Sequence, residues 1–191
     1  ELKPEGLEYT GRIVIKHFAW VLVEEIGLDT LKTFVTNPLE DMKIAPFYGC
    51  YILRPSDALG FDENPGRNQY LERIIDALSG EAVNFPGRLQ CCGFPIMLIN
   101  EKNSMAMVGK HTHDAKTAGA DAMVTPCPLC HLNLDGQQPK AQAQRGEKIG
   151  MPVLHLPQLV GMAMGLTQKE LGLGRHIVST KNLLEKASVR A

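Results

Sequence analysis

The chain has 191 residues, and 20 Lys+Arg against 21 Asp+Glu give it a formal net charge of −1. This near-neutral balance argues against a dedicated nucleic-acid-binding protein, which needs a basic surplus. A hydrophobic fraction of 44% with 21% charged residues excludes intrinsic disorder and is typical of one folded domain. No apolar run approaches the roughly 20 residues that span a bilayer, and we expect no signal peptide.

The predicted elements alternate between helices and strands. Two helices are expected near the start of the chain, over 9–27 and 29–35, and Asp29 is the predicted N-cap of the second. The later segments follow the same alternation. Strands are predicted at 43–48, 82–85, 122–125 and 151–155, and helices at 68–78, 101–118, from 128 with a break before 140, and at 157–166.

This order predicts an α/β fold, a parallel sheet of about four strands with helices on both faces. We expect residues 1–40 to form an N-terminal helical connector. Residues 41–180 are expected to form the α/β domain, and residues 181–191 a polar tail.

Five cysteines carry the strongest functional signal. They are Cys50, Cys91, Cys92, Cys127 and Cys130, spaced C-x40-CC-x34-CxxC. An odd number cannot pair fully within one chain, and secreted disulfide scaffolds are shorter and denser in cysteine. Each cysteine group follows a predicted strand. Because the carboxyl ends of parallel strands share one edge of the sheet, where ligands bind, we expect all five thiols to converge there.

Several kinds of site remain open for these thiols. Zinc takes four ligands in a tetrahedron, which two adjacent cysteines supply awkwardly and which leaves one thiol spare. A redox dithiol at Cys127 and Cys130 does not explain Cys50 or the adjacent pair. An iron–sulfur cluster explains more, and a helix starting near Cys127 would direct its positive end at an anionic cluster.

The histidines are weaker candidates. His155 ends the fourth predicted strand at the cysteine edge and is the candidate catalytic proton donor, with a backbone hydrogen bond as the competing interpretation. His131 follows Cys130 and is expected either near the cluster or facing solvent. His111 and His113 are expected on a solvated helix face.

Three short sequence stretches around the cysteines are similar to motifs of a known family. They are FYGC at 47–50, CCGFP at 91–95 and TPCPLC at 125–130. They resemble the CCG (cysteine-rich) domain family, and in particular the B-type component of heterodisulfide reductase, over about residues 12–180. Tyr48 and Phe94 flank cysteines in this sequence, and we expect them to shield a cluster from water.

The resemblance implies a non-cubane [4Fe-4S] cluster held by all five cysteines, in an oxidoreductase subunit that takes part in disulfide reduction. Electrons would arrive from partners that resemble the A-type and C-type components of heterodisulfide reductase. Zinc is an alternative occupant of the same cysteines in aerobically prepared protein. The resemblance places the chain in the cytoplasm, free or in a membrane-associated complex.

The B-type component of this family carries two CCG domains in tandem, with the substrate between their clusters. One motif is found here, so the chain resembles the C-terminal domain, and we expect the N-terminal CCG domain to be missing and the chain alone to be inactive. Two alternatives stay open. One is the iron–sulfur subunit of a lactate, glycolate or glycerol-3-phosphate oxidising complex, and the other is a non-catalytic zinc-binding scaffold domain.

Overall fold

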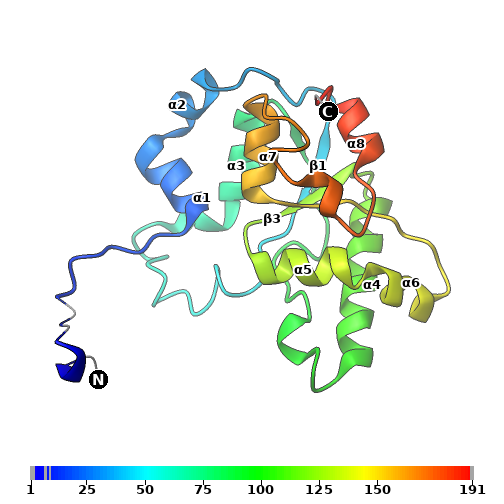
Figure 1. Ribbon diagram of the computed structural model, residues 1–191, viewed down its shortest axis with the longest axis horizontal. Helices are drawn as coiled ribbons and strands as arrows, with labels where there is room; N and C mark the ends of the chain where they lie inside the picture. The colour runs from blue at the N-terminus through cyan, green and yellow to red at the C-terminus, as the bar shows by residue number, and fades with distance from the viewer. Residues whose placement is uncertain (1–2, 7, 9, 190–191) are drawn as a thin grey trace.

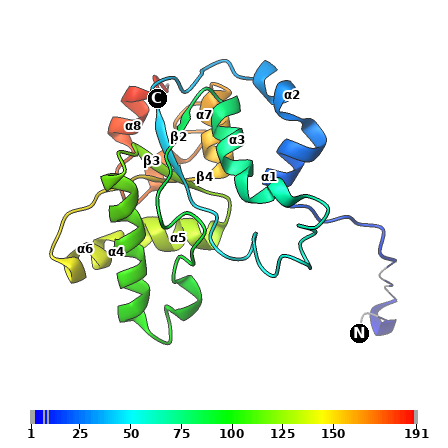
Figure 2. The same ribbon diagram turned by 180° about the vertical axis from the view of Figure 1, so that it is seen from behind.

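The computed structural model describes residues 3–6, 8 and 10–189. Its centre is a four-stranded parallel sheet with the strand order β2-β1-β3-β4, which confirms the predicted α/β fold (Figures 1 and 2). The strands are β1 (Lys43–Pro46), β2 (Glu81–Ala82), β3 (Ala122–Thr125) and β4 (Val153–His155). In the central pairing, Ile44 of β1 lies opposite Ala122 of β3 and also opposite Ala82 of β2.

The helices follow the predicted order. They are α1 (Phe18–Trp20), the π-helical turn η2 (Val21–Ile26), α2 (Leu28–Thr33), α3 (Tyr70–Ala77), α4 (Glu101–Thr117), α5 (Pro128–Gly136), α6 (Gln138–Arg145), α7 (Leu156–Ala163) and α8 (Lys181–Lys186). Short 3-10 turns cover Lys3–Glu5, Pro65–Gln69, Phe94–Ile96 and Leu173–Arg175.

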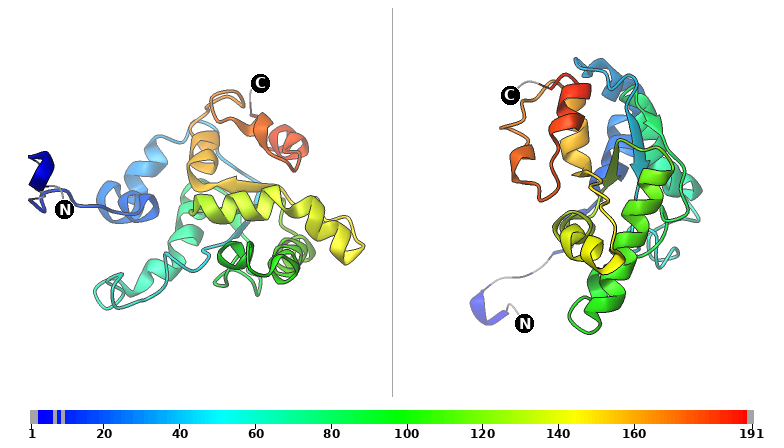
Figure 3. Two further views of the ribbon diagram at one scale, coloured as in Figure 1. Left: turned by 60° about the horizontal axis from the view of Figure 1, so that its bottom comes forward. Right: turned by 90° about the vertical axis from the view of Figure 1, so that its right-hand side faces the viewer.

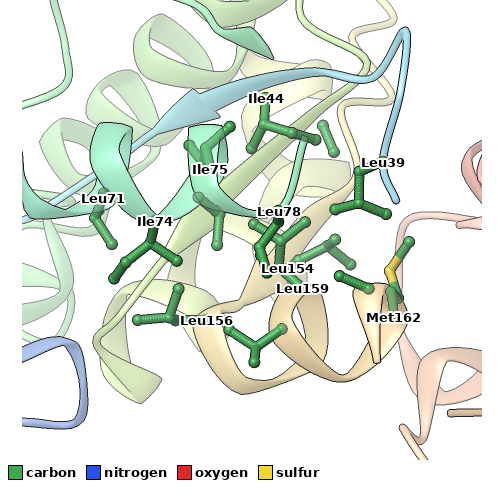
Figure 4. Packing of buried hydrophobic residues seen from close by; sticks show 14 of the residues in the cluster. Leu39, Ile44, Leu71, Ile74, Ile75, Leu78, Leu154, Leu156, Leu159 and Met162 are labelled. Carbon is green, nitrogen blue, oxygen red and sulfur yellow. The ribbon is translucent and has the colours of Figure 1, made fainter. Parts of the chain in front are cut away.

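Successive strand residues enter opposite cores, because side chains alternate across a sheet. Ile44 and Leu154 enter the first core, between the sheet and helices α3 and α7. In Figure 4, Leu71 and Ile74 of α3, and Leu78 just after it, point toward residues of β4 and α7. Their neighbours along the strands enter the second core, under α4, α5 and α6 (Figure 3). The cysteine-bearing helix α5 therefore packs on a different face from α3.

The N-terminal helix is shorter than the predicted 9–27. Helix starts at Phe18, and the preceding Ile13, Val14 and Ile15 are exposed, so no packing stabilises helix there. Asp29 is also not the N-cap of α2. Gly27 takes that position with a φ of +81°, a left-handed turn that glycine adopts without strain.

An ion pair between the buried Arg67 and the more exposed Glu24 joins this N-terminal region to the loop that follows Cys50. Arg67 binds Glu24 of η2 through both Nε and Nη2, at 2.7 and 2.9 Å, and its guanidinium stacks over Trp20 at 3.9 Å. The same side chain donates to the carbonyl of Leu59. Such bidentate geometry is the strongest form of an Arg–carboxylate contact, so it fixes the loop after Cys50 against the N-terminal helices.

The C-terminal segment also differs from the sequence prediction. Residues expected to form a polar tail include α8, whose Leu183 and Leu184 are buried in the first core. Helix α8 is too short for its two leucines to form a recognisable apolar periodicity in the sequence. None of the described helices has the length and hydropathy to cross a bilayer.

Candidate metal centre

The five cysteines are free thiols, and they meet at the carboxyl edge of the sheet. The sulfur atoms of Cys50 and Cys91 lie 4.0 Å apart. The Cys130 thiol lies close enough to the sulfurs of Cys92 and Cys127 to lower the pKa of both. Three cysteine groups separated by tens of residues in sequence thus lie near one another, as expected from the ends of parallel strands.

Each cysteine segment reaches this point by a different local structure. Cys50 follows β1 through a turn at Gly49, and Cys127 is the N-cap of α5, directly after β3. Cys91 and Cys92 belong to the irregular loop between β2 and the 3-10 turn at Phe94.

The turn at Gly49 depends on the absence of a side chain. Its φ is +73°, and a Cβ placed on it would lie 2.7 Å from the sulfur of Cys130. No real Cβ approaches a sulfur so closely, and Cys130 is buried. Glycine at this position therefore lets the chain carrying Cys50 pass directly against the sulfur of the CxxC helix.

Backbone amides point at the sulfurs of the adjacent pair. The N–H of Gly93 donates to Cys91 Sγ, and the N–H of Phe94 donates to Cys92 Sγ, each at 3.4 Å. Peptide N–H groups aimed at sulfur stabilise thiolates and tune the potential of sulfur-ligated metals. The loop is thus shaped to favour negative charge on both sulfurs.

The thiols differ in acidity because of their hydrogen bonds. A hydrogen bond from the Cys130 thiol, with the N–H groups of Cys130 and Leu129 at the start of α5, lowers the pKa of Cys127 to about 6. The same thiol, followed by the Phe94 N–H, lowers the pKa of Cys92. The pKa of Cys130 is raised by its interactions with Cys127 and Cys92 and by burial, and burial raises the pKa of Cys50 to about 11.

The donor set suits a soft metal. All five groups are thiols, and thiolates select zinc, copper(I) or iron–sulfur clusters. Within the described part of the chain, no three Cys, His, Asp or Glu side chains are grouped as ligands of a single metal ion. The sulfurs form an extended series instead, from Cys50 through the adjacent pair to Cys130 and Cys127.

The aromatic residues beside the cysteines lie in different cores. Tyr48 belongs to the first core, where its hydroxyl accepts from the Leu71 N–H at 2.8 Å and donates to Glu72. Burial, followed by the Glu72 contact, raises its pKa. Phe47, one residue earlier, lies in the second core with Cys92, as does the partly buried Phe94. Tyr48 therefore does not pack with the buried cysteines as expected, and Phe47 does.

His155 lies at the end of β4, and its Nε2 donates to the carbonyl of Pro126 at 3.2 Å. That is the contact of a strand-end histidine bonded to backbone, and its catalytic role stays a prediction. His131 packs edge-on against His176, with ring centroids 4.9 Å apart, and lies 6.1 Å from His155. Burial is the main cause that lowers the pKa of all three histidines.

His111 is not on a solvated face, contrary to the sequence prediction. It is 2% exposed, its Nε2 lies 2.9 Å from the carbonyl oxygen of Cys91, and burial lowers its pKa. His113, two residues later, keeps a partly exposed side chain beside Glu147. The sequence does contain a signal for this burial, because His111 continues the apolar stripe of Val108 and Ala115 along α4.

The cysteine-rich domain family (CCG) matches residues 44–135, a stretch that contains all five cysteines. This finding confirms the resemblance that the three cysteine stretches indicate.

Two relatives cover most of the chain. It is 39% identical over 178 residues to the 8-methylmenaquinol:fumarate reductase membrane anchor subunit of Wolinella succinogenes, covering 93% of this chain and 62% of that protein. It is 32% identical over 189 residues to the B-type component of the ferredoxin:CoB-CoM heterodisulfide reductase of Methanosarcina mazei, covering 97% and 62%. The chain therefore spans about three fifths of the length of these relatives.

The fold is also found in a solved structure. A crystal structure of a hypothetical protein from Helicobacter pylori matches 80% of this chain and 28% of its own, with a TM-score of 0.59 and 19% identity. At this identity the match concerns the fold alone. The kinship with a fumarate reductase component was not among the alternatives drawn from the sequence.

The contact between Gly49 and Cys130 can be tested with two alanine variants. Gly49 and Gly146 have φ values of +73° and +71°, so each Gly→Ala change carries about the same backbone strain, ~1 kcal/mol. Gly146 has nothing within 4 Å of an added Cβ. We expect Gly49→Ala to lower the free energy of unfolding in urea by about 1–3 kcal/mol more than Gly146→Ala, since overpacking adds that much. Equal losses would show that the sulfur contact does not constrain the turn.

The acidity of Cys127 gives a pH prediction for the metal-free chain. Because its folded pKa is lowered to about 6, its thiolate is present at pH 7 and is lost as the pH falls through that value. Alkylation by iodoacetamide, followed by mass spectrometry from pH 5 to 9, should show this midpoint. Cys130→Ala removes the main cause, so the midpoint should rise. A midpoint near that of a free thiol, about 8.5, in the unmodified chain would refute the assignment.

Proposed function

We propose that this chain is an electron-transfer subunit that binds one iron–sulfur cluster through Cys50, Cys91, Cys92, Cys127 and Cys130. The observation that carries the proposal is the convergence of five thiols, from the ends of three strands, into one series of neighbouring sulfurs. A tetrahedral zinc site uses four ligands and leaves the fifth thiol without a role.

The surroundings of the sulfurs support an anionic, multi-metal group. Cys92 and Cys127 are the thiols with lowered pKa, and four backbone N–H groups, those of Gly93, Phe94, Leu129 and Cys130, stabilise charge on the sulfurs. A four-iron cubane normally takes four cysteines. Five thiols exceed that number, and the resemblance to heterodisulfide reductase implies a non-cubane [4Fe-4S] cluster at this site. When bound, such a cluster accepts and donates single electrons.

The second core keeps much of the site away from water. Cys92 and Cys130 are buried within it, whereas Cys50, Cys91 and Cys127 are partly exposed. A half-buried cluster keeps one open side, toward a substrate or a redox partner, and its buried side sets the potential through the local dielectric. This asymmetry fits a subunit that exchanges electrons across its surface.

Disulfide reduction is the first candidate for the reaction. The Methanosarcina relative is named as a component of a heterodisulfide reductase. On this basis the partners would be the A-type and C-type components of such a complex and an N-terminal CCG domain that completes the site, and the chain alone would be inactive. The complex would work in the cytoplasm, free or attached to a membrane.

A quinol:fumarate reductase complex is the second candidate. It is favoured by the 39% identity to the Wolinella protein. The two candidates predict different electron acceptors for the tagged complex purified from its source, a disulfide in one case and fumarate in the other. Complexes that oxidise lactate, glycolate or glycerol-3-phosphate remain a further alternative.

His155 is the proposed proton donor if the acceptor is a disulfide. It stands at the same edge as the thiols, and a general acid there would protonate a leaving thiolate. Its Nε2–H is held by the Pro126 carbonyl, so donation would require that bond to be exchanged. It has no place among the cluster ligands, which makes it a control in the experiment below.

Anaerobic reconstitution with iron and sulfide tests the proposed cofactor. The chain should bind about four irons with acid-labile sulfide, the content of one [4Fe-4S] cluster. Cys92→Ala should abolish the visible absorption of the cluster, because all five thiolates are needed. His155→Ala should leave it unchanged.

Two outcomes would contradict this account. Stoichiometric zinc with no iron under strictly anaerobic conditions would favour a scaffold domain. An unaltered iron spectrum in Cys92→Ala, or in the matching Cys91→Ala variant, would show that one of the adjacent pair is not a ligand.

A further inference from the structure

The loop that carries Cys91 and Cys92 is wrapped around the ring of His111. The imidazole Nε2 lies 2.9 Å from the Cys91 carbonyl oxygen, and because a carbonyl only accepts, Nε2 carries the proton. On the other side of the ring, a Cβ at Gly87 would lie 2.6 Å from Nδ1. The ring also packs on Phe47, with centroids 5.2 Å apart. The loop therefore meets both nitrogens of the imidazole, at Cys91 and at Gly87.

Asn133 holds the next carbonyl of the same loop. It lies on α5, one turn after Cys130, and is 1% exposed. Its Nδ2 donates to the Cys92 carbonyl oxygen at 2.9 Å and lies 3.5 Å from Ser104 Oγ of α4. The helix that carries the CxxC cysteines therefore also grips the backbone of the adjacent pair.

These two contacts orient the peptides whose N–H groups serve the sulfurs. The Cys92–Gly93 peptide is held at its carbonyl by Asn133, and its N–H donates to Cys91 Sγ. The preceding peptide is held at its carbonyl by His111. With consecutive carbonyls fixed, the backbone between them cannot rotate, and the directions of both thiols are set.

Packing alone does not account for these side chains. His111 Nδ1 and Asn133 Oδ1 are buried and find no hydrogen-bond partner among the described residues. An unsatisfied buried polar atom destabilises a fold, and an apolar side chain of similar size would avoid that penalty. Each residue thus leaves one polar atom unpaired while its other polar atom binds a cysteine carbonyl.

We propose that His111 and Asn133 are positioning residues, which hold the backbone of Cys91 and Cys92 so that both sulfurs face the metal centre before any metal arrives. The holding contacts stand on geometry alone. Their use, the ordering of two cluster ligands, rests on the proposed function.

The contacts can be tested in the metal-free chain by alkylation of thiols with iodoacetamide under reducing conditions. Cys92 is 2% exposed, so it reacts only when the loop opens. His111→Leu and Asn133→Leu should each raise the rate for the peptide that carries Cys91 and Cys92 by about tenfold or more, with the rate for Cys50 unchanged. That factor is expected from the loss of one buried hydrogen bond.

Two further variants separate positioning from bulk packing. His111→Gln retains an N–H donor near the same place and should restore the slow rate to within about threefold of the unmodified chain. His113→Leu changes a partly exposed histidine on the same helix and should have no effect. A rate for the pair that is unchanged in both leucine variants would overturn the proposal. So would a common rise at Cys50 and the pair, or failure of His111→Gln to restore the slow rate.

A second measurement links the contacts to the cluster. After anaerobic reconstitution, Asn133→Leu should shift the midpoint potential to a more negative value, because the freed Gly93 N–H no longer stabilises added charge near Cys91. An unshifted potential would contradict the role assigned to Asn133. Failure of the unmodified chain to take up iron would instead overturn the proposed function and leave the alkylation result standing.

Discussion

The sulfur of Cys130 is the point on which the cysteine-bearing segments depend. It lies beside the sulfurs of Cys92 and Cys127 and lowers the pKa of both, and it fills the space that a side chain at Gly49 would need. The turn after β1, the loop after β2 and the start of α5 are therefore fitted around one buried atom. Because Cys130 is also part of the second core, the site and the fold share the same packing.

Around the sulfurs lies a layer of backbone groups, and behind it a layer of side chains. The N–H groups of Gly93 and Phe94 face the sulfurs of the adjacent pair, and His111 and Asn133 hold the carbonyls of the same loop. An irregular loop has no ladder of its own to fix it. Its geometry is supplied instead by α4 and α5, which explains how a segment without regular structure can present two adjacent thiols in defined directions.

Much of this arrangement could be predicted from the sequence. Strand β3 and helix α3 have strong local patterns, and the convergence of the thiols follows from parallel strand ends whatever the loops between them do. The fold class and the relationship to the B-type component of heterodisulfide reductase were predicted correctly. They depend on patterns that lie within single segments or on the spacing of the cysteines.

The errors concern features that only tertiary contacts decide. The apolar run at Ile13 to Ile15 suggests helix, but no surface covers it, and the short α8 is stabilised by the core it joins rather than by its own pattern. The burial of His111 is signalled by the apolar stripe of Val108 and Ala115, but its contact with the cysteine loop is visible only once α4 is placed. Asn133 holds a carbonyl 41 residues away, a contact that no local pattern reports.

The central claim is that one metal cluster is shared by all five thiols. The most direct test is a crystal structure of anaerobically reconstituted chain, with anomalous diffraction recorded at the iron edge. The account predicts a single iron-containing group in contact with the Sγ atoms of Cys50, Cys91, Cys92, Cys127 and Cys130. An iron group that leaves any of these sulfurs outside its ligand sphere, or a lone metal ion held by four of them, would contradict it.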